Sequence, residues 1–219
     1  MLCDATAVST ADPTTERGPA RTPGARVRLP RSARRAQLLD AAQEVFVAHG
    51  YHAAAMDEIA DAAGVSKPVL YQHFPGKLDL YLALLDRGAR DLIATVREAL
   101  ASTVDNRLRV TATMTAYLRF VDDEGAQRLV FESDLRSEPR VAERVDRMIR
   151  EAAEAIADTI AADTGLSADE ARLMSVGLAG MAEVAARWRL ANTAVSQERA
   201  AELLTQLAWR GISGYPRHD

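Results

Sequence analysis

Apolar residues recur with the period of an α-helix along most of the chain after Pro30. The first such segment predicts a helix that stops at Gly50, because glycine readily adopts the left-handed conformation that ends a helix. No sustained apolar–polar alternation of the kind that a strand shows is present, so the pattern predicts an all-α fold. The apolar positions of the first helix are Leu38, Ala41, Ala42, Val45 and Phe46.

A short helix, a turn and a second short helix follow this segment. The stretch "MDEIADAAG" predicts a helix with acids in its first turns, where the helix dipole favours negative charge, and with Gly64 at its end. Ser66 is the expected N-cap of the next helix, and Pro68 is tolerated in its first turn because no intrahelical donor is needed there. Leu70 and Phe74 are four residues apart, so both should face inward.

The remaining pattern predicts one long helix and a group of helices behind it. Residues 77–101 carry apolar positions near one stripe of a helix, and Asp105 is the expected cap of the helix that follows. Further helices are expected around residues 129–131, from residue 137 or 139, from Ser167, and from Ser196. The prediction is an all-α chain of nine helices.

The two short helices and the turn between them have the arrangement of a helix-turn-helix. In that motif the second helix lies in the major groove of DNA, and its first residues reach base edges. Gln72 has the amide that pairs with adenine, and Pro68 or Val69 can contact a thymine methyl group. Tyr71 and Lys77 are better placed for phosphates, which position a protein without specifying sequence. The alternative is a helical hairpin with a polar surface, because short three-helix folds share this spacing.

Charge is distributed unevenly along the chain. The net charge is −4, yet residues 17–35 hold seven arginines and no acid. Residues 17–77 contain nine Lys or Arg against five Asp or Glu, whereas 18 bases face 23 acids from residue 78 onward. A basic front and an acidic back are expected when one end meets nucleic acid. The predicted DNA-binding residues are Arg31, Arg34, Arg35, Ser66, Lys67, Pro68, Val69, Tyr71, Gln72, His73 and Lys77.

Residues 1–29 are rich in Pro, Thr, Gly, Ala and Arg and show no periodicity. We interpret them as a disordered basic N-terminal arm. Arms of this kind contact the minor groove or phosphates of DNA. The alternative is a leader that serves solubility alone.

The stretch "MDEIADAAGVSKPVLYQHFPGKLDLYLALL" resembles the DNA-binding head of the TetR family of transcriptional regulators. The resemblance covers about residues 33–85 and implies a helical effector-binding and dimerisation domain behind the head. One departure is Ala54 and Ala55, which stand where the family has a pair of threonines before the second helix. The matching residues are Ile59, Ala60, Ala63, Gly64, Val65, Ser66, Leu70, Tyr71, His73, Phe74 and Lys77.

A closer resemblance links the chain to mycobacterial regulators of fatty-acid synthesis within this family. It is carried by residues 46–74, by "VGLAGM" at residues 176–181 and by "AWRGIS" at residues 208–213. It implies a regulator of lipid-synthesis genes that senses long-chain acyl-CoA, with a head at residues 30–76 and an effector-binding and dimerisation domain at residues 77–219. The same fold could sense another hydrophobic molecule, such as a drug or a secondary metabolite, or could bind DNA as a structural protein without an effector.

Two groups of residues in the rear helices are candidates for function. Small residues allow close helix approach and large apolar ones fill the seam, which predicts a homodimer interface, although packing within one subunit explains them too. Methionines suit a pocket for a flexible apolar ligand, although ordinary core is the alternative for each pocket residue. The predicted interface residues are Gly177, Gly180, Leu203, Leu207 and Trp209. The predicted ligand-binding residues are Met114, Tyr117, Leu118, Phe120, Val121, Leu129, Phe131, Met148, Met174 and Met181. Arg119, Arg128 or Arg136 are candidates for a phosphate or carboxylate head group, although a solvated surface is the alternative for these arginines.

Several classes of function are not expected. Cys3 is the single cysteine, so no disulfide framework or thiolate metal site can form, which fits a reducing cytoplasm. The first residues lack the pattern of a signal peptide, and no uninterrupted apolar run reaches the ~18 residues of a membrane span. No histidine stands three residues after an acid, so a helical carboxylate–histidine metal motif is not expected. Neither a nucleophile–base pair nor a glycine-rich phosphate loop points to an enzyme or to a cofactor.

Overall fold

The computed structural model describes residues 29–123, 134–192 and 194–210, and every regular element in these ranges is helical. The predicted all-α class is confirmed. The described residues form eight α-helices and one 3-10 helix, and the short helix predicted around residues 129–131 lies outside them. The elements are α1 (Arg31–Ala53), α2 (Met56–Ala62), α3 (Lys67–His73), α4 (Lys77–Ala101), α5 (Asn106–Asp122), η2 (Asp134–Ser137), α7 (Pro139–Asp163), α8 (Ala168–Ala191) and α9 (Gln197–Arg210).

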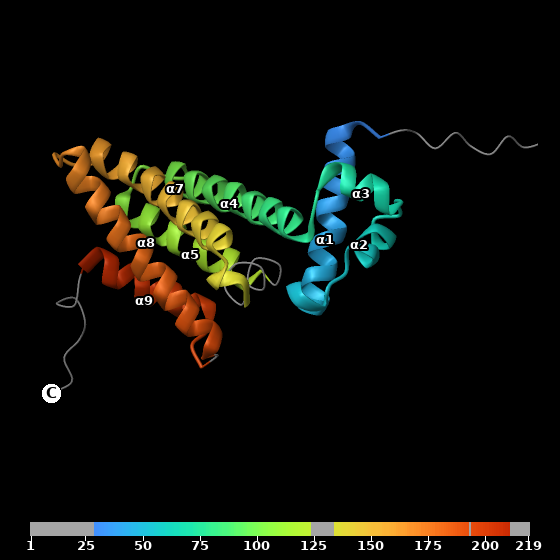
Figure 1. The fold of residues 1–219 in the computed structure, drawn as a ribbon. Helices are drawn as coiled ribbons and strands as arrows, with labels where there is room; N and C mark the ends of the chain where they lie inside the picture. Colours follow the sequence, from blue (N-terminus) through green and yellow to red (C-terminus); the bar gives the residue numbers. More distant parts are fainter. Residues whose placement is uncertain (1–28, 124–133, 193, 211–219) are drawn as a thin grey trace, which may run out of the picture.

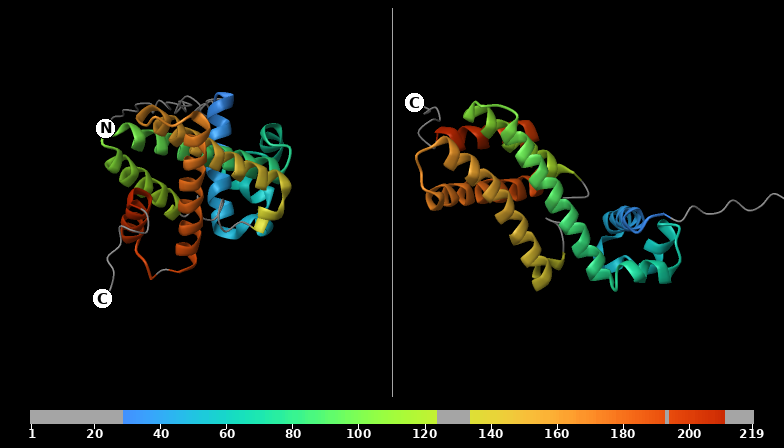
Figure 2. Two further views of the ribbon diagram at one scale, coloured as in Figure 1. Left: turned by 90° about the vertical axis from the view of Figure 1, so that its left-hand side faces the viewer. Right: turned by 90° about the horizontal axis from the view of Figure 1, so that it is seen from above.

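The helices fall into two groups joined by α4. Figure 1 shows α1, α2 and α3 gathered at one end of the molecule, which we call the head, and α5, α7, α8 and α9 at the other end, which we call the body. The view from above in Figure 2 shows α4 leaving the head and continuing into the body, where it packs against α5 and α7.

The head folds around one apolar core. Leu38 and Phe46 of α1 are buried there, and Leu70 and Phe74 pack into the same core, as predicted. Gly50 has a φ of +74° and interrupts α1, so that the chain turns toward α2. Glycine adopts a positive φ without the steric cost that other residues incur, and the predicted helix stop is therefore confirmed.

The head is attached to α4 through three aromatic rings. Tyr81 of α4 is buried, and its ring meets Phe46 at 5.5 Å and Tyr51 at 5.3 Å, edge to face in both cases. Each pair of this kind contributes about 0.5–1.5 kcal/mol beyond the burial itself. Residues 80–85 are all buried, rather than a single stripe, because α4 packs against the head and against the body along this stretch.

Two buried clusters organise the body. The first continues from the head along α4 to Val145 and Met148 of α7. The second joins α5, α8 and α9 and includes Leu118. Tyr117 and Phe120 of α5 are partly buried against both clusters, so apolar packing is continuous from the head to α9.

Two of the predicted N-cap residues make capping hydrogen bonds, and a third does not. Asp105 accepts a hydrogen bond from the first turn of α5, and Ser167 forms the predicted capping box with Glu170 at the start of α8. Ser66 occupies the N-cap position of α3, but its side chain makes no capping hydrogen bond. Helix α7 begins at Pro139, and its cap is Glu138.

Candidate functional site

The short helix α3 presents one side to solvent. Leu70 and Phe74 hold it on the head, so the side chains opposite them are not needed for the core. Val69 and His73 are half-buried. The exposed members of the predicted DNA-binding set on and before α3 are Ser66, Lys67, Pro68, Tyr71 and Gln72.

A groove of about 500 Å³ lies between α3 and the start of α1. It brings arginines of α1 next to the exposed side of α3, although the two segments are far apart in the sequence. Arg34 donates to Oε1 of Gln37 at 2.8 Å, and Gln37 donates to the carbonyl of Ala63 at 2.7 Å, which ties this arginine to the end of α2. The groove is lined by Leu29, Arg31, Arg34, Val69, Gln72 and His73.

Arg35 completes the arginines predicted for DNA binding on α1. Its guanidinium lies 4.4 Å from the centre of the Phe74 ring, where the face of the ring attracts a cation. The three arginines therefore form a positive rim beside α3, and such a rim attracts the phosphates of a nucleic acid.

His73 lies among these arginines. Partial burial lowers the pKa of its imidazole below the ordinary value, and the charges of Arg31, Arg35 and Arg34 lower it further. The ring is therefore neutral at pH 7 in the free protein. Phosphates placed in the groove would act in the opposite direction and favour its protonation.

Lys67 forms an ion pair with Asp57 of α2, with 2.6 Å between Nζ and Oδ2. The hydrogen bond to Asp57 raises the pKa of Lys67. Both side chains are more than half exposed, so the pair contributes little to stability. The ammonium can therefore exchange the carboxylate for a base or a phosphate at small cost.

The ammonium of Lys77 is engaged within the chain. Its ammonium donates to the carbonyl of Tyr51 at 2.8 Å, of His52 at 3.2 Å and of Ala54 at 2.8 Å. It also lies 4.5 Å from the centre of the Tyr51 ring. These carbonyls are left without helical partners where α1 ends, and they engage all three donors of the ammonium. Lys77 therefore braces α1 against α4 in this structure, and its contact with a phosphate stays a prediction.

The start of α2 reflects the departure noted at Ala54 and Ala55. Ala55 is the N-cap residue, and no side chain caps the helix there. His49 of α1 contacts Glu58 of α2, with 2.8 Å between Nε2 and Oε1, and so links the two helices across this uncapped start.

Two adjoining cavities lie within the body. The larger has a volume of about 220 Å³ and is lined by α4, α5, α7, α8 and α9. The smaller has a volume of about 40 Å³ and is lined by α4, α5, α7 and α8. Thr113, Met114 and Ile156 line both cavities, so the two spaces meet at these residues. Most of the remaining lining side chains are apolar, which suits a hydrophobic ligand.

Four of the predicted ligand-binding residues line these cavities. Met114 lines both, Tyr117 and Met148 line the smaller one, and Met174 lines the larger one. Burial raises the pKa of the Tyr117 hydroxyl, and the nearby carboxylate of Glu183 raises it further. The hydroxyl therefore stays protonated, and the smaller cavity has a polar end.

Four other predicted ligand-binding residues line neither cavity. Leu118 and Val121 are fully buried in the second cluster, and Phe120 and Met181 pack against that cluster. Their contacts are those of core residues, which a pattern of apolar positions cannot separate from a pocket lining. The remaining two predicted ligand-binding residues, Leu129 and Phe131, lie outside the described residues.

Sequence reasoning missed several residues that line the cavities. Ile156 belongs to the apolar stripe of α7, and a stripe of this kind looks the same whether it meets a neighbouring helix or an empty space. Leu178 and Thr113 gave no signal at all, because neither stands out from its surroundings in the sequence.

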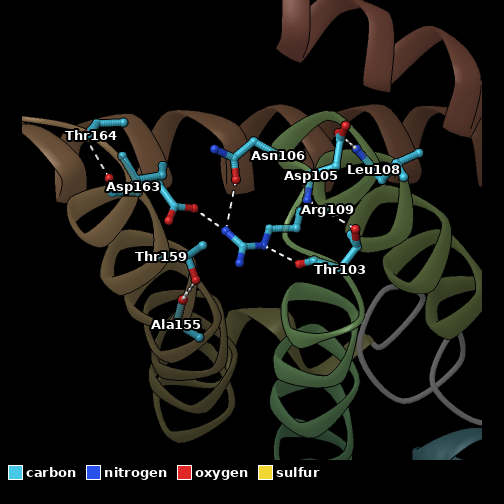
Figure 3. Close-up of polar contacts among 10 residues, drawn as sticks. Thr103, Asp105, Asn106, Leu108, Arg109, Ala155, Thr159, Asp163 and Thr164 are labelled. Carbon is cyan, nitrogen blue, oxygen red and sulfur yellow. Dashed lines mark hydrogen bonds and ion pairs between the residues drawn. The ribbon is translucent and has the colours of Figure 1, made fainter.

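Arg109 is the arginine at the larger cavity, and the sequence did not single it out. Its Nε donates to the carbonyl of Thr103 at 2.7 Å, its Nη1 donates to Oδ1 of Asn106 at 3.0 Å, and its guanidinium pairs with Asp163. Figure 3 shows the side chain extending from α5 toward Asp163 on α7, with Thr159 on the next turn of that helix. The positive charge at this cavity is therefore already neutralised by a carboxylate.

Of the three arginines predicted for an acidic head group, Arg119 is the one whose side chain the structure describes. Arg119 is exposed and lines neither space. Arg128 and the side chain of Arg136 lie outside the described part of the chain.

The outer face of α8 exposes large apolar side chains at the spacing of one helical stripe. Gly177 and Gly180 lie in the same stripe, and a Cβ atom added to either would meet no atom within 4 Å. Neither glycine is therefore required for packing within this chain. The exposed apolar residues of this stripe, each between 52% and 75% exposed, are Leu173, Val176, Val184 and Trp188.

The other predicted interface residues are divided between different environments. Leu203 and Leu207 of α9 are half-buried. Trp209 is 46% exposed and lines the larger cavity. Ala182 of α8 is buried in the second cluster, on the side of the helix that faces its own subunit.

Within the described ranges, no three His, Cys, Asp or Glu side chains come together in a way that could hold a metal ion. No helix in the same ranges has both the length and the apolar character needed to cross a membrane.

Comparison with known proteins gives three findings. Residues 38–84 match the model of the bacterial regulatory proteins of the tetR family. The HTH-type transcriptional activator FasR of Mycolicibacterium smegmatis is 49% identical over 191 residues, which cover 86% of this chain and 87% of FasR. A TetR-like transcriptional regulator from Rhodococcus sp. RHA1 is 29% identical, with a TM-score of 0.61 and coverage of 86% of this chain and 100% of that one.

A further solved structure is similar in fold alone. FadR from Bacillus subtilis, in complex with stearoyl-CoA, has a TM-score of 0.65 at 19% identity and covers 81% of this chain and 98% of its own.

Replacing Lys77 with Met is expected to lower the free energy of unfolding by about 1–3 kcal/mol, because carbonyl oxygens at the end of α1 lose their donor. Urea unfolding followed by circular dichroism measures this change. Lys67→Met is the matched control, since it removes only the exposed pair with Asp57 and should leave the unfolding midpoint nearly unchanged. Equal losses in both variants would contradict the role of Lys77 as a brace.

Lowering the pH is expected to destabilise the protein through His73. The pKa of His73 is lower in the folded protein than in the unfolded chain, so the unfolded chain binds a proton first as the pH falls. The stability that depends on the neutral ring is complete above about pH 6.5 and is lost below it. In His73→Asn the difference in unfolding free energy between pH ~7.5 and pH ~5.5 should therefore be smaller than in the wild type. Identical differences would rule His73 out as a source of the pH dependence.

Proposed function

This chain belongs to the TetR family of bacterial regulatory proteins, and from that premise we propose that it is a homodimeric transcription factor controlled by a long-chain acyl-CoA. In this proposal residues 1–29 form a basic arm, residues 30–76 bind DNA, and residues 77–219 bind the effector and the second subunit. The protein acts in the cytoplasm. The resemblance of residues 46–74 to regulators of fatty-acid synthesis supports lipid-synthesis genes as its targets.

The observation that carries the proposal is the exposed side of α3 next to the arginine groove. The amide of Gln72 suits the N6 and N7 edge of adenine, and Pro68 or Val69 suits a thymine methyl group. Arg34 lines the groove and Tyr71 is exposed on α3, and contacts of these two side chains with phosphates would set the register of α3 on the duplex. Two copies of α3 would enter successive major grooves about 34 Å apart on a pseudo-palindromic operator.

The exposed apolar face of α8 supports the homodimer. Contiguous apolar surface on a water-soluble chain marks a site of association, because its exposure is unfavourable. A twofold axis brings the same face of two subunits together, and the two glycines in the stripe allow the helices to approach closely. Leu203 and Leu207 of α9 are half-buried and would add apolar surface beside α8.

The apolar cavities support a hydrophobic effector. Stearoyl-CoA, bound by FadR of Bacillus subtilis, is a molecule with a long acyl chain, and that protein shares the fold described above. Ligand pockets have volumes of about 300–1,000 Å³, so the cavity of about 220 Å³ must widen to hold such a chain. Met114 and Met174 line it, and methionine side chains rearrange readily.

Helix α4 connects the effector cavities to the head. Arg87 of α4 pairs with Asp40 of α1 at 2.6 Å, and Asp86 of α4 pairs with Arg144 of α7. A ligand that spreads α4 from α7 would therefore move the head and change the spacing of the two α3 helices. The ligand can shift the equilibrium between the two spacings of the α3 helices only by the ratio of its affinities for them. A ~100-fold ratio corresponds to about 2.7 kcal/mol.

Palmitoyl-CoA is expected to change the affinity of the full-length protein for its operator by about tenfold or more, measured by a gel-shift titration with a duplex selected from random sequences. CoA without an acyl chain should have no effect. Leu178→Trp fills the larger cavity and should abolish the response while operator binding persists. Leu108→Trp, on an exposed position of α5 that lines neither cavity, is the control. An operator affinity that palmitoyl-CoA leaves unchanged would refute the proposed effector.

Val184→Glu is expected to convert the dimer into monomers, because it places a charge at the centre of the exposed face of α8. Sedimentation velocity gives the oligomeric state, and operator affinity should fall with it. Val104→Glu serves as the control, since Val104 is 90% exposed in the turn between α4 and α5, far along the chain from α8. A Val184→Glu protein that remains a dimer would exclude this face as the interface.

A further inference from the structure

Thr113 of α5 differs from most other threonines of the body helices and of α4. A helical threonine commonly turns its hydroxyl toward the carbonyl four residues earlier. Thr113 makes no such bond, and its Oγ1 is buried without a hydrogen-bond partner among the described residues. The residue is only 8% exposed, so bulk water does not compensate. The usual bond is made by Thr95 to Asp91 at 2.8 Å, Thr111 to Arg107 at 3.0 Å, Thr159 to Ala155 at 3.3 Å, and Thr164 to Ile160 at 2.7 Å.

The hydroxyl of Thr113 is placed to meet a ligand in the cavities. Thr113 lines both the larger and the smaller cavity and so stands at the place where they meet. Met114 and Ile156 share that place, and both are apolar. A polar group enclosed by apolar side chains is unfavourable unless a partner reaches it, so the junction favours a ligand that brings a hydrogen-bonding atom there.

The charges around the cavities determine whether the ligand atom that reaches Thr113 is charged or neutral. Arg109 and Asp163 line the larger cavity and neutralise each other, and Glu183 lines the smaller one. The described lining residues therefore offer no additional cation to a carboxylate. Glu183 is itself paired with Arg187 of α8. A fatty-acid carboxylate at the junction would therefore lose its hydration and find no unpaired cation among the described lining residues, which is costly for a buried anion. An esterified carbonyl is uncharged and accepts a hydrogen bond, so it meets neither penalty.

We propose that the hydroxyl of Thr113 donates a hydrogen bond to the carbonyl oxygen of an esterified acyl chain, and that it thereby makes the cavity selective for acyl thioesters and esters over free fatty acids. This inference rests on the proposed control by acyl-CoA and adds to it a specificity-determining residue. The shared chemistry is the esterified carbonyl, whether a thioester or a glycerol ester supplies it.

Isothermal titration of the full-length protein with two matched ligands tests the bond. Palmitoyl-CoA has the carbonyl, and S-hexadecyl-CoA has the same chain length and head group but a thioether in its place. Thr113→Val keeps the shape of the side chain and removes the hydroxyl. It should weaken palmitoyl-CoA binding about threefold to tenfold, the range expected for one neutral hydrogen bond, and leave S-hexadecyl-CoA binding unchanged.

Thr205→Val is the matched control. Thr205 of α9 is also buried, at 7% exposure, and its hydroxyl likewise has no partner among the described residues, but it lines neither cavity. Its substitution should leave the affinity for both ligands unchanged. Thermal unfolding of both variants without ligand should show equal or higher melting temperatures than the wild type, because each loses an unpaired buried hydroxyl.

Titrations with two further ligands complete the test. Palmitate should bind at least about tenfold more weakly than palmitoyl-CoA because its charge is uncompensated. If the cavity also accepts a glycerol ester, Thr113→Val should weaken the binding of 1-palmitoylglycerol as much as it weakens the binding of palmitoyl-CoA. If 1-palmitoylglycerol does not bind, the thioester is the source of the carbonyl. Equal effects of Thr113→Val on palmitoyl-CoA and S-hexadecyl-CoA, or no effect on either, would overturn the role of Thr113. Absence of binding of every acyl ligand to the wild type would instead overturn the proposed effector.

Discussion

The contact between Tyr81 of α4 and the rings of Phe46 and Tyr51 on α1 determines how the head sits on the rest of the chain. Lys77 strengthens the same junction, because its ammonium is held by carbonyls at the end of α1. Close-packed interiors shift between discrete arrangements and do not deform continuously. A displacement of α4 in the body therefore carries the whole head, and with it the exposed side of α3.

Three features of the isolated chain are unfavourable for its own stability. The outer face of α8 exposes apolar side chains, Thr113 buries a hydroxyl that has no partner in the described part of the chain, and His73 lies among three arginines. In the proposed function each is relieved by a different partner, namely a second subunit, an acyl chain and DNA. Departures from local stability of this kind are expected at functional sites. They also separate the three activities in space, since the features lie on α8, α5 and α3 respectively.

Local chemistry made most of the fold predictable. Gly50 and Gly64 have positive φ values where the sequence pattern ends a helix, and Asp105 and Ser167 cap the helices that follow them. Such signals act within a few residues and survive in any tertiary context. The bracing role of Lys77 was not predicted, for the complementary reason. Its partners lie more than twenty residues earlier in the chain, and nothing local indicates that carbonyls at the end of α1 would come within reach.

The sequence by itself determined the all-α class, the helix-turn-helix and the residues that α3 exposes, because helical periodicity and capping are encoded by neighbouring residues. Only the tertiary structure decided which apolar residues line a cavity and which fill the core. Met114 and Leu118 are both apolar, lie one turn apart on α5 and belong to the same cluster with α8 and α9, yet of the two only Met114 also lines the cavities. That difference depends on the distances between helices. These distances arise from the packing of the entire body, so no single segment of the sequence determines them.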